Sequence, residues 1–159
     1  MKLQKFVIYS LIFCVFSLAG CSKDDESLKD VEVVFGTYKF IFPPGFKFVT
    51  QLEVDFWWGS VSNDKMIFLF DHGYHNYPPN DIPSAENEVT EEDFEGRYLR
   101  IAKPRDSQNG WTSIYISPVK EVGEGEMHWG LHMRVTNLTP EEQELAISIF
   151  RSVTIVPQN

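Results

Sequence analysis

Residues 127–153, MHWGLHMRVTNLTPEEQELAISIFRSV, decide how the rest of the chain folds. The first nine of them alternate like a strand with one buried face, because successive side chains of a strand point to opposite sides. The face predicted to join the core carries Met127, Trp129, Leu131, Met133 and Val135, and the wetter face carries His128, Gly130, His132 and Arg134. One strand of a sheet is therefore expected over residues 127–135.

A helix is predicted directly after this strand. Thr139-Pro140-Glu141-Glu142 has the spacing of a capping box, with proline at the first helical position, where its missing N–H costs nothing. Apolar residues then recur at helical spacing and form one stripe, made of Leu145, Ala146, Ile149, Phe150 and Val153. A stripe of this kind is laid on a sheet.

Short apolar runs separated by turn residues predict further strands, beginning near Val31. They cover residues 38–42, 46–49, 54–61, 66–71, 97–102 and 111–117, with a last run at 152–156. The polar residues 73–96 are expected to form a long loop, with a short helical turn near Glu91 to Phe94. Many strands with one C-terminal helix predict an α+β fold, an antiparallel β-sheet with the helix packed on one face.

The runs 54–61 and 66–71 are expected to pair as a hairpin. Asn63-Asp64 suits the centre of a two-residue turn, because both residues tolerate positive φ. That turn would place Trp57 opposite Phe70 and Asp55 opposite His72. An Asp55–His72 cross-strand pair is one expectation for this histidine.

Two segments resemble a known fold. Phe40-Ile41-Phe42-Pro43-Pro44-Gly45-Phe46 and residues 144–154, ELAISIFRSVT, are similar to the opening and the ending of PsbP-like and Mog1-like proteins. The resemblance implies an α/β/α sandwich. It implies no functional residue, because that fold hosts unrelated binding roles.

The first 20 residues have the layout of a secretory signal peptide. Lys2 and Lys5 precede an apolar run from Phe6 to Ala19, and small residues close it. The run is shorter than the roughly 20 apolar residues of a spanning helix. It is therefore expected to be removed.

The exit of that segment, Leu18-Ala19-Gly20-Cys21, resembles the lipobox of bacterial lipoproteins. The resemblance implies cleavage before Cys21 and a diacylglyceryl group on its thiol, so that the lipid bilayer is the expected partner of this residue. The alternative is an ordinary signal peptide with a chance cysteine.

Charged residues follow the lipid site. Ser22-Lys23-Asp24-Asp25-Glu26 resembles the signal that exports lipoproteins of the Bacteroidota to the outer face of the outer membrane. The alternatives are a solvated tether and retention on the periplasmic side.

Three parts are expected: a signal peptide at 1–20, a flexible acidic tether at 21–31 and a single globular domain at 32–159. Cleavage removes Lys2 and Lys5 and leaves 12 basic and 23 acidic side chains, a formal charge of −11. Nucleic acid is therefore not an expected partner, since its binding needs basic surface. The two cysteines lie in the signal and at the lipid site, so no disulfide is expected within the domain.

No catalytic, cofactor or metal site is predicted. A Gly-x-Ser-x-Gly elbow does not occur in the sequence. His128 and His132 would lie about 13 Å apart along one strand, too far for one ion, and a site would need one of them to meet Asp71, His72 and His75. The acids between Glu86 and Glu95 lack the spacing of a calcium loop and are expected to be solvated.

The aromatic residues offer the candidate binding residues. Trp57 and Trp58 are neighbours in a predicted strand and so point to opposite faces. With Tyr74 and Trp111 they could form an exposed platform for a saccharide or a protein, although large aromatics mostly serve packing. The expected function is a non-enzymatic binding or envelope domain on a lipid anchor. The alternative is a small extracytoplasmic hydrolase that uses acidic residues or histidines.

Overall fold

Two antiparallel sheets and one helix make up the described part of the chain. The computed structural model describes residues 29–52, 56–73, 82–119 and 130–157. A seven-stranded sheet has the order β3-β4-β5-β9-β8-β7-β6, and a three-stranded sheet has the order β1-β2-β10. The elements are β1 (Val31–Phe35), β2 (Tyr38–Phe42), β3 (Lys47–Leu52), β4 (Phe56–Ser62), β5 (Ile67–Gly73), β6 (Asn87–Phe94), β7 (Arg97–Pro104), β8 (Trp111–Val119), β9 (Gly130–Thr136), α2 (Pro140–Arg151) and β10 (Thr154–Ile155).

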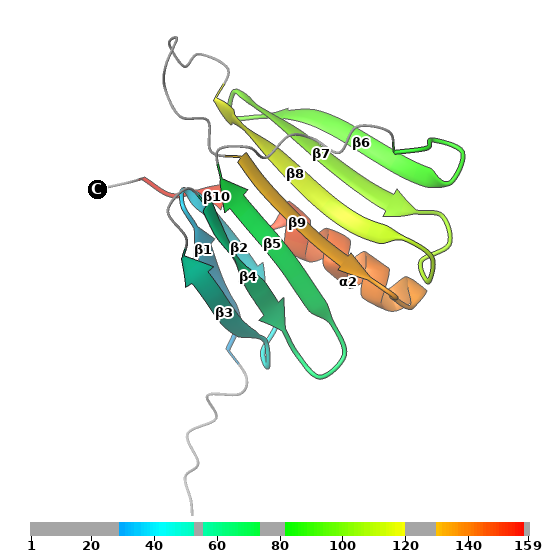
Figure 1. Cartoon of the computed structure of the whole chain (residues 1–159), viewed down its shortest axis with the longest axis horizontal. Coiled ribbons are helices and arrows are strands. Elements are labelled where there is room, and N and C mark those ends of the chain that lie inside the picture. The colour runs from blue at the N-terminus through cyan, green and yellow to red at the C-terminus, as the bar shows by residue number, and fades with distance from the viewer. Residues whose placement is uncertain (1–28, 53–55, 74–81, 120–129, 158–159) are drawn as a thin grey trace, which may run out of the picture.

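The small sheet and α2 lie on the same side of the large sheet (Figure 1). We call this side the inner face and the opposite side the outer face. The core lies between the layers, with Phe40, Phe68, Ile114, Met133 and Phe150 among its fully buried residues. The predicted α+β class, with a C-terminal helix on one face of an antiparallel sheet, is confirmed.

The described residues place no helix on the outer face. A three-layer α/β/α sandwich would need helices on both faces, whereas here the inner layer combines α2 with the small sheet. No helix within the described ranges has the length and hydropathy needed to cross a membrane.

The helix begins as its capping box predicts. The Thr139 side chain accepts a hydrogen bond from the Glu142 N–H at 3.3 Å, and the Glu142 carboxylate accepts one from the Thr139 N–H at 2.9 Å. Ala146, Ile149 and Phe150 are buried against the sheet. Thr139 and Glu142 thus satisfy backbone donors that a helix start leaves open.

The alternation predicted for residues 127–135 is confirmed where the structure describes it. Leu131, Met133 and Val135 of β9 are buried in the core, while His132 and Arg134 lie on the other face. Residues 127–129 lie outside the described ranges.

The predicted register of the β4–β5 hairpin is wrong by two residues. Ser62 pairs with Ile67, so four residues form the loop, and Trp57 lies opposite His72 rather than Phe70. The side chain of Asn63 causes the longer loop, because its Oδ1 accepts hydrogen bonds from the N–H groups of Lys65 and Met66 at 2.9 and 2.7 Å. Asp55 lies outside the described ranges.

The predicted loop over residues 73–96 is wrong in its second half. Residues 87–94 form β6, an edge strand paired with β7, and no helical turn forms at Glu91 to Phe94. Glu95 and Gly96 make the two-residue turn, with φ of 50° and 78°. Charged side chains suit a solvent-facing edge, and ion pairs such as Lys103–Glu88 at 3.6 Å join the two strands.

Gly59 of β4 leaves no room for a side chain. A Cβ there would clash with the backbone oxygen of Val49 and lie 2.9 Å from Cζ of Phe70. Glycine at this position therefore lets the Phe70 ring lie over β4 and contact Phe48 in a stacked pair, with centroids 5.7 Å apart.

Candidate binding site

Strand pairing arranges the outer face in rows. One row runs across the sheet through Gln51, Trp58, Asp71, His132, Tyr115, Arg100 and Glu91. The next row runs through Val49, Ser60, Leu69, Arg134, Ser113, Ala102 and Val89. Because side chains of a strand alternate between the faces, both rows point away from α2.

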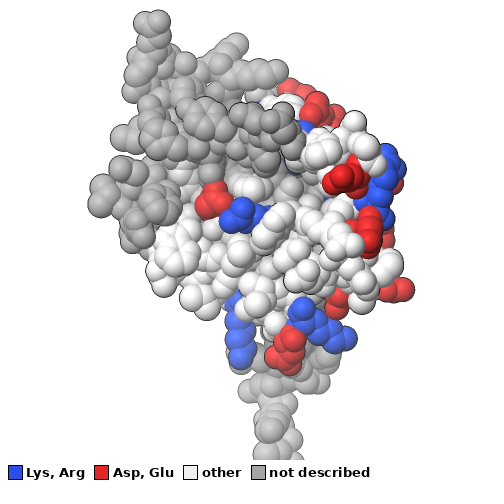
Figure 2. Space-filling view, turned by 45° about the vertical axis from the view of Figure 1, so that its right-hand side comes forward, with Lys and Arg blue, Asp and Glu red and all other residues white. Residues whose placement is uncertain are grey.

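Several exposed apolar side chains lie on the outer face. Trp58 is 40% exposed and Trp111 45% exposed, and Leu69, Ile67 and Val49 are also exposed there. Figure 2 shows uncharged atoms over the middle of this side of the molecule, around one acidic and one basic side chain, with other charged groups gathered toward the edge. Exposed apolar surface of this kind often marks an interaction site.

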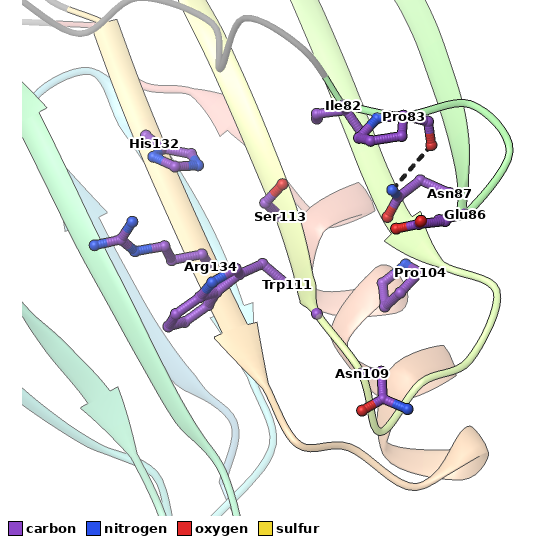
Figure 3. A pocket seen from close by; sticks show the side chains of 11 residues that line it. Ile82, Pro83, Glu86, Asn87, Pro104, Asn109, Trp111, Ser113, His132 and Arg134 are labelled. Atoms are coloured by element: carbon purple, nitrogen blue, oxygen red, sulfur yellow. Dashed lines mark hydrogen bonds between the residues drawn. The ribbon is translucent and has the colours of Figure 1, made fainter.

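A pocket of about 300 Å³ opens on this face. Its lining combines β7, β8 and β9 with the segment that leads into β6: Ile82, Pro83, Glu86, Asn87, Pro104, Asn109, Gly110, Trp111, Ser113, His132 and Arg134. Figure 3 shows Trp111, His132 and Arg134 on one side and Ile82, Pro83, Glu86 and Asn87 on the other. Arg134 and His132 thus lie across the pocket from Glu86.

Arg134 is held by an aromatic ring rather than by a carboxylate. Its guanidinium carbon lies 4.9 Å from the centre of the Trp111 ring, within the range of a cation–π contact. Within the described residues it forms no ion pair, whereas Arg100, Arg105 and Arg151 each pair with a glutamate. Its Nε is buried and has no hydrogen-bond partner among those residues.

His132 lies one row away from Arg134 on the same strand. Its Nδ1 is 3.7 Å from Oδ2 of Asp71, and its side chain is 14% exposed. Its Nε2 is buried without a hydrogen-bond partner in the described part of the chain. Within the described part of the chain, one buried polar atom on each of these two side chains therefore has no hydrogen-bond partner.

Local hydrogen bonds fix the opposite wall. The Asn87 side chain donates to the carbonyl of Pro83 at 3.1 Å, as does the backbone N–H of Glu86. At the lower rim, the Asn109 amide donates to the Asp106 carboxylate at 2.6 Å. The wall is thus built by short-range contacts and does not depend on a bound molecule.

The structure separates the four predicted binding residues. Trp111 lines the pocket, and Trp58 lies exposed on the same face outside its lining. Trp57 points to the inner face, half-buried, with its ring 5.8 Å from that of His72. Tyr74 lies outside the described ranges. The expectation that Trp57 and Trp58 point to opposite faces is confirmed.

Sequence reasoning missed most of the pocket lining. The alternation of residues 127–135 places His132 and Arg134 on one face, which was the available signal. Nothing in the sequence shows that β8 lies beside β9, and this pairing brings Ser113 opposite Arg134 and Trp111 within reach of it. Glu86 and Asn87 belong to a segment predicted to be an open loop.

The two described histidines, His72 and His132, do not join one group of metal ligands. Asp71 and His72 are consecutive in β5 and point to opposite faces, so His132 meets Asp71 and not His72. His72 is buried, and burial lowers its pKa to about 4 against the opposing effect of the Asp71 charge. His75 and His128 lie outside the described ranges. Within those ranges, no cluster of three or more His, Cys, Asp or Glu side chains could hold a metal ion.

Comparison with known proteins adds no relative. No family model, no curated protein and no solved structure matches the chain.

Proposed function

We propose that the protein is a lipid-anchored lipoprotein facing the cell exterior, and that its domain binds a saccharide in the pocket on the outer face. The lipobox and the residues behind it support the anchor and its orientation, although they lie outside the described ranges. The pocket beside the exposed Trp111 ring is the observation that carries the binding role. Its volume of about 300 Å³ lies at the lower end of the range for small-molecule sites.

The lining chemistry favours a saccharide over a folded protein. An aromatic ring offers an apolar surface to the C–H face of a sugar, and polar groups around it serve the hydroxyls. Asn87 and Glu86 on one wall and His132 on the other supply such groups. A stable protein interface instead buries about 800 Å² on each partner and needs a broad surface rather than a small pocket.

The hydrolase alternative makes a different demand on the pocket. Glycoside hydrolysis commonly uses two carboxyl groups on either side of the scissile bond. Among the described residues that line the pocket, Glu86 is the one carboxylic acid. The lining is therefore closer to that of a binding site.

The anchor is tested by lipid labelling of Cys21→Ser in cells. We expect the variant to lose the label and to leave the membrane fraction, because no other thiol lies at the cleavage site. Cys14→Ser is the matched control: Cys14 lies within the segment expected to be removed, so labelling should be unchanged. Membrane retention of the Cys21→Ser protein would contradict the anchor.

The orientation is tested by protease added to intact cells. We expect the domain to be digested in the wild type, and to be protected when the charges at Lys23, Asp24, Asp25 and Glu26 are neutralised. Resistance of the wild-type protein in intact cells would place the domain on the periplasmic side.

The binding role is tested on the unlipidated Cys21→Ser protein with an oligosaccharide array followed by calorimetry. Trp111→Ala should weaken binding by about 2 kcal/mol or more, roughly 30-fold, as loss of a central anchor does. Trp58→Ala is the control, since Trp58 is exposed on the same face but outside the pocket lining. An equal loss in both variants, or no saccharide bound at all, would refute the assignment.

A further inference from the structure

We infer that the bound saccharide is acidic, with a carboxylate that Arg134 receives on the β9 side of the pocket. This inference rests on the proposed function and goes beyond it, because it names the charge and the orientation of the ligand.

Arg134 is the reason to expect a carboxylate. Among the described residues Arg134 has no carboxylate partner, whereas Arg100, Arg105 and Arg151 are each paired with a glutamate. Arg97 also lacks such a pair but does not line this pocket. The Trp111 ring holds the Arg134 side chain in place from one side. Because no described carboxylate pairs with its guanidinium, the terminal N–H groups remain available to a carboxylate at the pocket.

His132 bears on the orientation of the sugar. Its Nε2 is buried without a partner in the described part of the chain, while its Nδ1 faces Asp71 at 3.7 Å. Asp71 thereby favours the tautomer that keeps a proton on Nδ1. In that tautomer Nε2 is an acceptor, which suits a sugar hydroxyl rather than a carboxylate.

The opposite wall fixes the direction of the ligand. Glu86 lies across the pocket from Arg134 (Figure 3). A carboxylate bound beside Glu86 would be repelled, whereas sugar hydroxyls can donate to it and can pair with the Asn87 amide. A sugar with hydroxyls at one end and a carboxylate at the other matches this arrangement in one orientation only.

The net negative charge of the protein works against the binding of acidic ligands. The mature chain carries a formal charge of −11, so its overall field repels anions. A measured preference for an acidic ligand would therefore report on the local positive charge of Arg134 in the pocket.

The test uses the full mature chain as the Cys21→Ser protein. The probes are oligosaccharides that contain galacturonate, glucuronate, mannuronate or sialic acid, each compared with the neutral form in which the carboxylate has been reduced to an alcohol. We expect at least one acidic probe to bind tenfold or more tightly than its neutral form. Arg134→Gln should abolish this preference, because the acidic probe then loses its tenfold advantage over the neutral form.

Lys47→Gln is the matched control. It removes one positive charge from β3, next to Ser62 in the pairing and outside the pocket lining, so the preference should persist. Both variants should melt within a few degrees of the parent protein. The inference fails if every neutral form binds as tightly as its acidic form, or if the preference survives in Arg134→Gln; binding that still depends on Trp111 would then leave the proposed function standing. No binding of either form would overturn both.

Discussion

The inner and outer faces of the seven-stranded sheet are built from the same strands but meet different surroundings. In β5, Phe68 is fully buried on the inner face, whereas its neighbour Leu69 is 38% exposed on the outer face. In β9, Met133 is fully buried, and Arg134 beside it lines the pocket. The difference arises from what packs on each side, since α2 and the small sheet lie on the inner face.

The two faces therefore contribute differently to the stability of the fold and to ligand binding. Close-packed apolar side chains on the inner face supply most of the free energy of folding. The outer face carries the exposed rings of Trp58 and Trp111 and the positively charged Arg134, which contribute less to the packing of the core. A change on the inner face should therefore affect stability first, and a change at the outer pocket should affect binding first.

The largest effect is expected from Phe68→Ala. The Phe68 ring contacts Phe42, Phe46 and Phe150, with centroids 5.3 to 5.9 Å apart. Its truncation would leave a cavity in the core and lower the free energy of unfolding by about 3 to 5 kcal/mol.

The next residue in the chain is the control for Phe68. Leu69→Ala on the outer face should lower the free energy of unfolding by about 1 kcal/mol or less, because its side chain stays partly in water. Urea unfolding followed by circular dichroism measures both. Equal losses would show that the outer face is packed as tightly as the inner one.

The second effect is a pH dependence of the stability, expected from His72 on the inner face and not from His132 on the outer face. Burial lowers the pKa of His72 from 6.5 to about 4. The unfolded chain therefore takes up a proton near pH 6.5, and the folded chain does so only near pH 4. The stability that neutral His72 contributes is complete above about pH 6.5 and is lost as the pH falls, by about 3 kcal/mol at pH 4.

Urea unfolding at pH 7, 5.5 and 4 measures this loss. His72→Leu should flatten that part of the profile, and His132→Gln, which changes a histidine of the outer face, should leave it in place. A wild-type profile that equals that of His72→Leu would show that His72 does not carry the effect.

The third effect compares two adjacent tryptophans. Trp57 is half-buried on the inner face beside His72, and Trp58 is 40% exposed on the outer face. Trp57→Ala should lower the free energy of unfolding by about 2 kcal/mol, and Trp58→Ala by about 1 kcal/mol or less. Thermal melting of the single variants measures both losses. If neither variant folds, Trp58 contributes to the packed core and is not an exposed residue of the outer face.

The parts that the sequence predicts are those whose signals are local. The capping box at Thr139 and Glu142 and the alternation of Leu131, Met133 and Val135 specify a helix and a strand without reference to any other segment. The inner and outer sides of β9 follow from the same pattern. The α+β class follows from one helix among many strands.

The parts that the sequence misses depend on a neighbour. β6 reads as a charged loop, and it is a strand because β7 supplies hydrogen bonds and basic partners for its glutamates. The hairpin register depends on hydrogen bonds of the Asn63 side chain. The pocket needs β8 beside β9 and the segment before β6 across from them, and no residue pattern shows either arrangement.

The smallest effect is expected at the edge of the outer face. Glu91 of β6 forms an ion pair with Arg100 of β7, with 3.6 Å between Oε1 and Nε. The Glu91 side chain is 53% exposed. An exposed pair contributes about 0 to 1 kcal/mol, because water and salt screen it. Glu91→Gln should therefore lower the free energy of unfolding by about 0.5 kcal/mol at low salt, and by less in 1 M NaCl. Glu141→Gln, in the first turn of α2, is a control that removes an exposed acid elsewhere. A salt-independent loss above about 2 kcal/mol for Glu91→Gln would mean that the pair is desolvated, and that the edge of the outer face is more deeply covered than its exposed glutamates indicate.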